Sequence, residues 1–177
     1  MMLSEELYPQ RVFYYFEQIA AIPHGSRNTK AISDFLVNFA KEHNLVWYQD
    51  ENNNVVIVKE ASAGYEAAEP IIIQGHMDMV CEKEKGVDID FEKDGLKLYI
   101  DGDFLKAEGT TLGGDDGIAV AYALALLDSQ EIAHPKLEVV ITVDEEIGML
   151  GADAIDLSML TGHTMLNIDS DVEGSFL

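Results

Sequence analysis

"PIIIQGHMDMV" (residues 70–80) leads four apolar residues through Gln74 and Gly75 to His76 and Asp78. A short apolar run bounded by proline and glycine predicts a buried strand over residues 71–74. In extended chain, residues i and i+2 point the same way, so His76 and Asp78 face the same side. A buried strand needs neither an imidazole nor a carboxylate at its end. The pair therefore indicates a site at that end of the strand.

Apolar periodicity predicts the other elements around this strand. We expect helices over residues 9–21, 28–44, 116–127 and 151–157, and strands over residues 45–48, 55–59, 137–143 and 165–168. An Asp-Gly turn joins residues 96–100 and 104–107 as a hairpin. Strands that alternate with helices and are apolar on both faces predict one α/β domain, with a largely parallel mixed sheet sandwiched by helices.

The charge of the chain limits its partners. It has 33 acidic and 11 basic residues, a net charge of −22, which disfavours nucleic acid and anionic membranes as partners. Clustered carboxylates suit divalent cations, although the acidity could also serve solubility alone. Cys81 is the single cysteine, the N-terminus lacks a signal-peptide pattern, and residues 118–127 form too short an apolar run to span a bilayer. We expect a cytoplasmic protein without a membrane partner.

Acidic residues follow each predicted buried strand and open the buried helix. The residues concerned are His76 and Asp78; Asp144, Glu145 and Glu146; Asp169 and Asp171; and Asp115 and Asp116. Ligands of α/β sheets gather outside the carboxyl ends of the strands. The sequence therefore predicts that these side chains meet at one edge of the sheet and bind divalent metal.

The spacing suggests a role for each group. His76 can offer one ring nitrogen to a metal while Asp78 accepts a hydrogen bond from the other. Adjacent Glu145 and Glu146 project in different directions, so one would bind metal and the other would act as general base. Asp115 lies in a glycine-flanked turn, where a carboxylate could bridge two ions about 3.5–4 Å apart.

Four segments resemble the aminoacyl-histidine dipeptidases, also described as Xaa-His or cytosolic non-specific dipeptidases. They are "GHMDMVCEK" (75–83), "DGDFLKAEGTTLGGDDGIAVAYAL" (101–124), "TVDEEIGMLGA" (142–152) and "NIDSD" (167–171). This family belongs to the di-zinc aminoacylase/carboxypeptidase-type metallopeptidases, and the similarity spans nearly the whole chain. The resemblance implies a zinc-peptidase-like catalytic domain that hydrolyses Xaa-His and other dipeptides.

The resemblance also implies a role for each site residue. His76 and Asp169 would bind one Zn²⁺, Glu146 the other, and Asp115 both. Asp78 would orient His76, and Glu145 would be the general base. Co²⁺ or Mn²⁺ could replace zinc. The peptide bond between Asp115 and Asp116 is expected to be cis.

Two departures from the family pattern accompany the resemblance. Asp116 stands where family members often have asparagine, and we expect this change to be tolerated because Asp115 is the ligand. Members of the family are longer chains, with a dimerisation and lid domain and a final histidine that binds metal. None of the other histidines in this sequence is well placed to serve as that ligand. Residues 1–177 are thus expected to be the N-terminal portion of the catalytic domain, inactive alone and homodimeric when full length.

Two other functions stay open at this point. A related zinc deacylase or carboxypeptidase would use the same scaffold, and a non-catalytic acidic metal-binding domain would need the ligands alone. Glu145 argues against the second, because a passive metal site needs no base beside its ligands.

Overall fold

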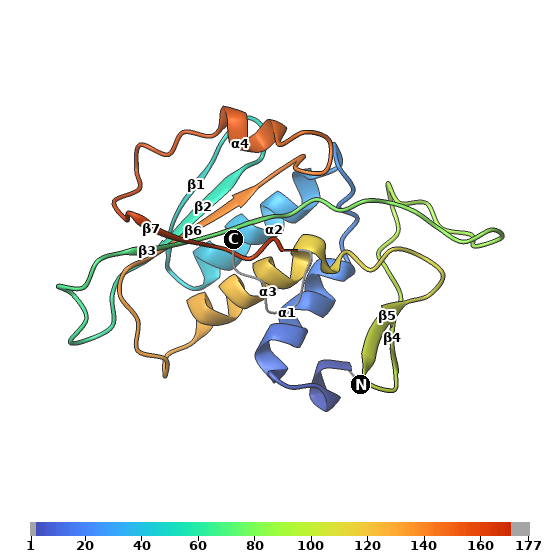
Figure 1. The fold of residues 1–177 in the computed structure, drawn as a ribbon, viewed down its shortest axis with the longest axis horizontal. Coiled ribbons are helices and arrows are strands. Elements are labelled where there is room, and N and C mark those ends of the chain that lie inside the picture. The colour runs from blue at the N-terminus through green and yellow to red at the C-terminus, as the bar shows by residue number, and fades with distance from the viewer. Residues whose placement is uncertain (1–2, 171–177) are drawn as a thin grey trace.

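The computed structural model describes residues 3–170, which form a central sheet with helices on its faces (Figure 1). Asp171 lies outside the described residues. The elements are η1 (Leu3–Glu6), α1 (Gln10–Ala20), α2 (Lys30–Glu42), β1 (Val46–Gln49), β2 (Val55–Lys59), β3 (Ile71–His76), β4 (Leu98–Asp101), β5 (Phe104–Ala107), α3 (Gly114–Asp128), β6 (Leu137–Thr142), α4 (Leu150–Ala154) and β7 (Thr164–Asn167).

The central sheet has the strand order β1-β2-β6-β3-β7. β3 pairs in parallel with β6 and β7, whereas β2 is antiparallel to both β6 and β1. Four strands therefore run in one direction and β2 runs in the other, so the predicted largely parallel mixed sheet is confirmed. The carboxyl ends of β3, β6 and β7 consequently lie at the same edge.

Apolar side chains cover both faces of this sheet. Val55 and Ile57 of β2 point into the main core with α1, α2 and α3, and Val56 and Val58 pack on the other face. The second face is covered by α4 and the segment that follows it, opposite α1 and α3 (Figure 1). Strand β2, predicted over residues 55–59, occupies those residues because both of its faces are buried.

Most predicted elements differ from the structure by one or two residues at an end, and α2, α4 and β7 differ for identifiable physical reasons. Helix α2 begins at Lys30 rather than at residue 28, because residues 25–28 form a turn closed by a hydrogen bond from Asn28 N to Gly25 O. Helix α4 ends at Ala154, and Ile155 is already extended. The predicted buried strand over residues 165–168 is β7, and the prediction of burial is wrong: all four residues of β7 are exposed.

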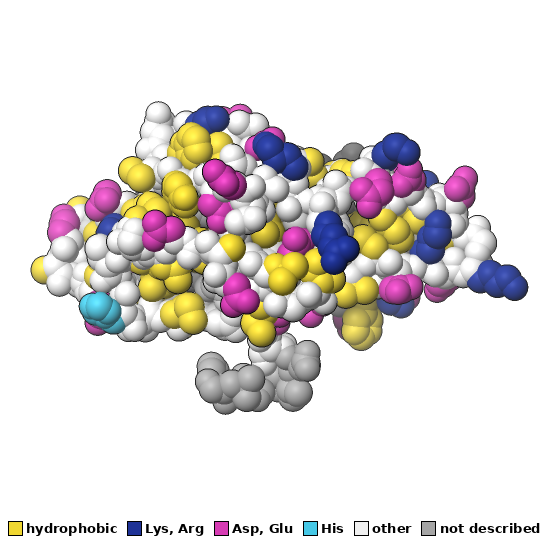
Figure 2. Space-filling model, turned by 90° about the horizontal axis from the view of Figure 1, so that it is seen from above, with side chains coloured by type: hydrophobic (Ala, Val, Ile, Leu, Met, Phe, Trp, Pro, Cys, Tyr) yellow, Lys and Arg dark blue, Asp and Glu magenta, His cyan; other side chains and the backbone are white. Residues whose placement is uncertain are grey.

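The exposure of β7 follows from its place in the sheet. It is the edge strand and pairs only with β3 among the described strands. Met165 and Leu166 are 58% and 52% exposed, although both are strongly apolar. Apolar side chains are also visible on the α4 side of the surface, between acidic ones (Figure 2). An apolar sequence run does not distinguish an edge strand from a central one.

Glu138 is a fully buried acid within β6. Its carboxylate accepts hydrogen bonds from Thr161 N, Thr161 Oγ1 and Gly162 N at 2.7–3.0 Å, and Lys136 Nζ lies 2.8 Å away. Burial alone would raise the pKa of Glu138, but Lys136 and these donors outweigh it and lower the pKa to about 2. The ionised side chain therefore fastens the segment leading into β7 to the centre of the sheet.

We expect Glu138→Gln to lower the free energy of unfolding by about 3 kcal/mol at neutral pH, since each pKa unit is worth about 1.4 kcal/mol. The pKa falls from 4.5 in the unfolded chain to about 2, so this stabilisation is complete above about pH 4.5 and is lost as pH falls towards 2. Denaturant unfolding across that range should show the difference between the two proteins shrinking in acid. Glu131→Gln, at an exposed acid, is the control; a difference that does not change with pH would contradict the prediction.

Candidate metal centre

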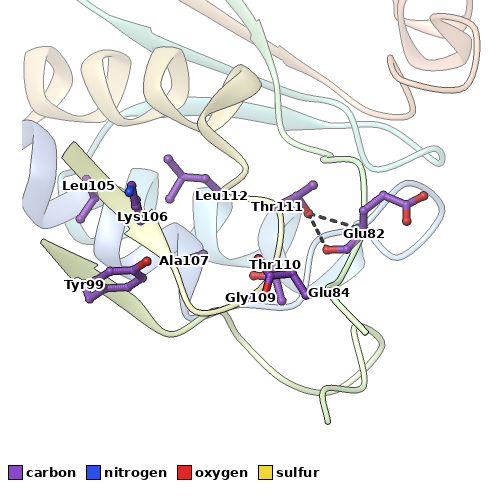
Figure 3. A pocket seen from close by; sticks show the side chains of 10 residues that line it. All are labelled: Glu82, Glu84, Tyr99, Leu105, Lys106, Ala107, Gly109, Thr110, Thr111 and Leu112. Carbon is purple, nitrogen blue, oxygen red and sulfur yellow. Dashed lines mark hydrogen bonds between the residues drawn. The ribbon is translucent and has the colours of Figure 1, made fainter. Parts of the chain in front are cut away.

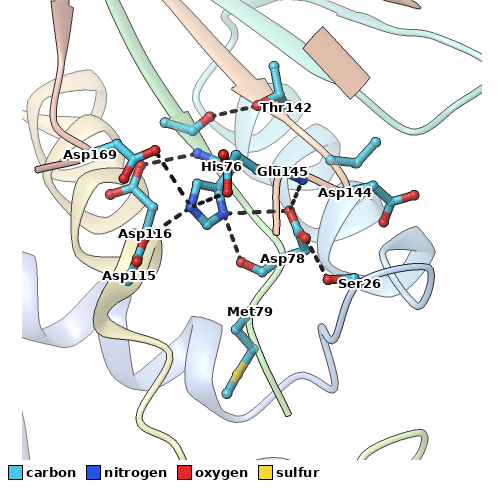
Figure 4. A network of polar contacts seen from close by, with 12 residues as sticks. Ser26, His76, Asp78, Met79, Asp115, Asp116, Thr142, Asp144, Glu145 and Asp169 are labelled. Carbon is cyan, nitrogen blue, oxygen red and sulfur yellow. Dashed lines mark hydrogen bonds and ion pairs between the residues drawn. The ribbon is translucent and has the colours of Figure 1, made fainter. Parts of the chain in front are cut away.

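His76 is the buried centre of a cluster of carboxylates at the carboxyl edge of the sheet. It ends β3 and is only 1% exposed. Its Nε2 atom lies 3.1 Å from Asp115 Oδ1, 3.8 Å from Glu145 Oε2 and 4.0 Å from Asp169 Oδ2 (Figure 4). These side chains come from the end of β3, the start of α3, and the segments after β6 and β7. The structure thus brings together residues that are far apart in the sequence.

Five predicted metal and base residues fall into two overlapping triplets. His76, Asp115 and Glu146 form one, and His76, Glu145 and Asp169 form the other; the ligand atoms within each triplet lie within 4.8 Å of one another. The adjacent glutamates therefore belong to different triplets, as expected from their different directions. Imidazole and carboxylate groups are suitable ligands for zinc and similar divalent ions.

Asp78 is buried beneath this cluster and supports two of its parts. Its backbone carbonyl is the nearer acceptor for His76 Nδ1, at 2.9 Å, whereas its carboxylate lies 3.5 Å from the same nitrogen. The carboxylate instead accepts hydrogen bonds from Glu145 N at 3.0 Å and Ser26 Oγ at 2.8 Å. Burial raises the pKa of Asp78, but its hydrogen bonds with His76, Glu145 and Ser26 outweigh this and lower it. The carboxylate, which was the predicted acceptor for His76, thus lies farther from Nδ1 than the Asp78 carbonyl does, and it also holds Glu145 N.

The glycine-flanked turn before α3 places Asp115 beside His76. Gly113 has a left-handed φ of 68°, and a Cβ there would lie 2.9 Å from Met79 Sδ. The Asp115–Asp116 peptide bond is cis, as predicted from the resemblance. Asp115 and Asp116 have non-helical dihedral angles, so the two carboxylates leave the helix start in different directions.

Asp116 is one of the acids that the sequence places at this edge, but its spacing gave it no role of its own. It is 1% exposed, and its Oδ2 accepts a hydrogen bond from His76 N at 3.2 Å. A Cβ on Gly75 would lie 2.5 Å from this oxygen, so glycine lets the start of α3 approach β3. Burial first, and then the charges of Asp169 and Asp115, raise the pKa of Asp116 to about 7 despite the opposing effect of His76. The sequence signal for this residue was the pair of acids, Asp115 and Asp116, at the start of an apolar helix.

The proximity of like charges also affects the other groups. The pKa of Glu146 is raised by burial and by the charges of Asp115 and Glu145. Burial alone would lower the pKa of His76, but Asp78 and Asp116 outweigh it and raise the pKa to about 9. Shifts of this kind in a shared cluster are typical of functional sites, and a bound cation would compensate the excess negative charge.

The other histidines do not join either triplet among the described residues. His134 and His163 precede β6 and β7, so they lie at the opposite edge of the sheet, as predicted. His43 Nε2 lies 2.9 Å from Asp128 Oδ1 near the end of α3. Buried His24 donates from Nδ1 to the carbonyl of Ile22.

A separate hollow lies beside the β4–β5 hairpin (Figure 3). It is lined by the hairpin and by residues including Glu82, Glu84 and Thr111, and Thr111 is hydrogen-bonded to the backbone of Glu82. None of the predicted site residues lines it. Within residues 3–170, no helix has the length and apolar character needed to cross a bilayer.

The fold and the cluster together define an α/β protein with a candidate divalent-metal centre at the carboxyl edge of its sheet. Residues 72–173 match the model of peptidase family M20/M25/M40, and the chain belongs to this family. The matched range contains His76, Asp115, Glu145, Glu146 and Asp169. Membership implies the use of a divalent metal ion, in agreement with the donor set.

Individual relatives are similar over nearly the whole chain. The cytosol non-specific dipeptidase of Escherichia coli (strain K12) is 40% identical over 169 residues, covering 96% of this chain and 35% of the relative. The crystal structure of aminoacylhistidine dipeptidase from Vibrio alginolyticus superimposes with a TM-score of 0.93 at 40% identity, covering 97% of this chain and 35% of that one. The chain thus spans about a third of the length of these relatives.

A more distant neighbour shows the same fold. A tripeptidase from Staphylococcus aureus superimposes with a TM-score of 0.76 at 24% identity, covering 92% of this chain and 44% of that one. The suspected resemblance to the aminoacyl-histidine dipeptidases and the predicted fold class are therefore confirmed.

Proposed function

We propose that the protein hydrolyses dipeptides in a metal-dependent reaction, and that residues 1–177 are the N-terminal portion of its catalytic domain. The observation that carries the proposal is the pair of overlapping His–carboxylate triplets at the ends of β3, β6 and β7 and the start of α3. The names of the E. coli and V. alginolyticus relatives support dipeptides, including those with C-terminal histidine, as substrates. The name of the E. coli relative, a cytosol non-specific dipeptidase, also supports a cytoplasmic location for this protein.

The donor set has the ligand types that zinc prefers. In this proposal His76 and Asp169 would bind one ion, Glu146 would bind a second, and Asp115 would bind both. Asp115 is suited to the shared position because its side chain is 65% exposed and it lies 3.1 Å from His76. The carboxylates form an accessible rim over the buried imidazole, so a small peptide could reach them. A zinc site of this kind supplies a Lewis acid that polarises the peptide carbonyl and activates water.

The remaining chemistry belongs to side chains of this chain. Glu145 takes a proton from the attacking water and later gives it to the leaving amine, as a general base and then a general acid. Its side chain is 30% exposed and its Oε2 lies 3.8 Å from His76 Nε2, so it faces the same space as the ligands. Asp78 acts as a positioning residue, because it fixes the orientation of His76 and holds Glu145 N.

The protein that carries this sequence should hydrolyse unblocked dipeptides, some of them with C-terminal histidine, and lose this activity in a chelator. The reason is that the cluster consists of ligand-type groups whose negative charge is compensated by metal. Amine release from a panel of dipeptides, before and after chelation and after adding Zn²⁺, Co²⁺ or Mn²⁺, measures this. N-acylated amino acids in the same panel test the deacylase alternative. Full activity in metal-free protein would contradict the proposal.

A further inference from the structure

Asn54 has a fully buried side chain that was not assigned to any site. Its Oδ1 accepts a hydrogen bond from Val143 N at 3.0 Å, and its Nδ2 donates to Gly151 O at 3.0 Å and to Asp50 Oδ2 at 2.7 Å. One acceptor and two donors are thus used in a single amide. Among the side chains, only the amide of asparagine or glutamine offers two N–H donors and a carbonyl acceptor in one neutral group.

The topology of the sheet explains why Asn54 reaches these atoms. β2 is antiparallel to β6, and Val55 pairs with Ile141. Asn54, one residue before β2, therefore lies beside the end of β6, where residues 143–151 leave the sheet. This segment carries Glu145 and Glu146.

The two ends of the segment meet at this amide. Gly151 N donates to Val143 O at 3.0 Å, so the segment closes on itself as it enters α4. A Cβ on Gly151 would lie 2.4 Å from Val143 O and 2.5 Å from Asn54 Oδ1, so the contact leaves no room for a side chain. Asn54 adds one hydrogen bond at Val143 and one at Gly151, and a single side chain thereby holds both ends of the segment.

Asn54 is itself held in one orientation. Asp50 Oδ1 accepts from Asn54 N at 2.8 Å, and Asp50 Oδ2 accepts from Asn54 Nδ2. Gly151 O and the Asp50 carboxylate can only accept hydrogen bonds, whereas Val143 N can only donate. The amide therefore has a single orientation that satisfies all its neighbours.

We propose that Asn54 is a positioning residue for the reaction, acting by holding residues 143–151 so that Glu145 and Glu146 face His76. Asn54 is in neither triplet, so its effect passes through the segment. The assignment of a catalytic effect rests on the proposed function. The mechanical effect on the segment does not depend on it.

Two variants test this proposal in the protein that carries this sequence. Asn54→Asp keeps the size and one acceptor but removes both donors, and Asn54→Ser shortens the side chain without adding charge. Both should speed hydrogen exchange in residues 143–151 and lower kcat on a dipeptide by about 100-fold, with KM changed by less than about threefold, because a displacement of about 1 Å is enough for such a loss.

Leu127→Ala is the matched control. Leu127 is buried in the core near the far end of β2, where Lys59 Nζ binds the carbonyl of Leu126, so its loss weakens packing without touching residues 143–151. The control should leave kcat and exchange in that segment unchanged. A folded Asn54→Ser protein with the original kcat and exchange, or a Leu127→Ala protein with an equal fall in kcat, would overturn the proposal.

The readouts separate this inference from the proposed function. A parent protein that cleaves no dipeptide would overturn the proposed function and the catalytic effect of Asn54. Faster exchange in residues 143–151 of both variants would still show that Asn54 holds the segment, and unchanged exchange would refute that as well.

Discussion

Glu145→Ala is expected to lower kcat for dipeptide hydrolysis by about 10²–10⁴-fold, the contribution of a general base, while leaving the bound metal near its original level. The reason is that Glu145 and Glu146 are adjacent but belong to different triplets. If Glu145 moves protons and Glu146 binds metal, removal of the first costs rate and removal of the second costs metal. Measuring zinc content beside kcat in the same preparations distinguishes these effects.

Glu146→Ala is the matched control for this experiment, since it removes the same side chain one residue away. It should lower the affinity for zinc, and adding excess zinc should restore part of the rate. Added zinc should not restore Glu145→Ala. Loss of metal from Glu145→Ala, with metal retained by Glu146→Ala, would show that the two roles are reversed.

The elements that carry the site could be predicted from local sequence patterns. The apolar runs of β3 and β6 end a few residues before His76 and the two glutamates, and parallel strands place such ends at one edge. The meeting of Asp169 with His76 followed from the same rule, and that of Asp115 followed from its place at the start of the buried helix. The ends of helices such as α2 and α4 differed, because turns and extended residues replace their expected first or last residues, and the burial predicted for β7 was wrong.

The supporting contacts could not be predicted in this way. Asn54 is 89 residues from Val143, and Asp116 is 40 residues from His76, so neither contact leaves a periodic signal. Glu138 looks like an interruption of an apolar strand until Thr161 and Gly162 are seen to surround it. Each of these buried polar groups is stabilised by partners distant in sequence, which single-residue patterns do not contain.

His76→Ala is expected to have the widest effect on metal binding, because His76 is the one residue shared by both triplets. Loss of an outer supporting group costs a metal site about 10–100-fold in affinity, and loss of a direct ligand should exceed that. We expect zinc titration to show a fall of more than about 100-fold and dipeptide hydrolysis to disappear. Asp115, Glu146 and Asp169 would remain, but without the imidazole their carboxylates lose the central partner that lies within 4.8 Å of each.

His134→Ala controls for the loss of a buried imidazole. His134 is 7% exposed, precedes β6 at the opposite edge of the sheet, and contacts the carbonyl of Pro135 through Nδ1 at 2.7 Å. Its replacement should lower thermal stability, because a buried side chain is lost. Zinc affinity and kcat should stay within about twofold of the original, because His134 lies away from the cluster and is not a ligand. If His76→Ala keeps its zinc, or if His134→Ala loses as much, then the metal does not depend on the carboxyl edge of this sheet. If His76→Ala and His134→Ala have similar stability but only the first loses zinc affinity, then His76 itself binds the metal.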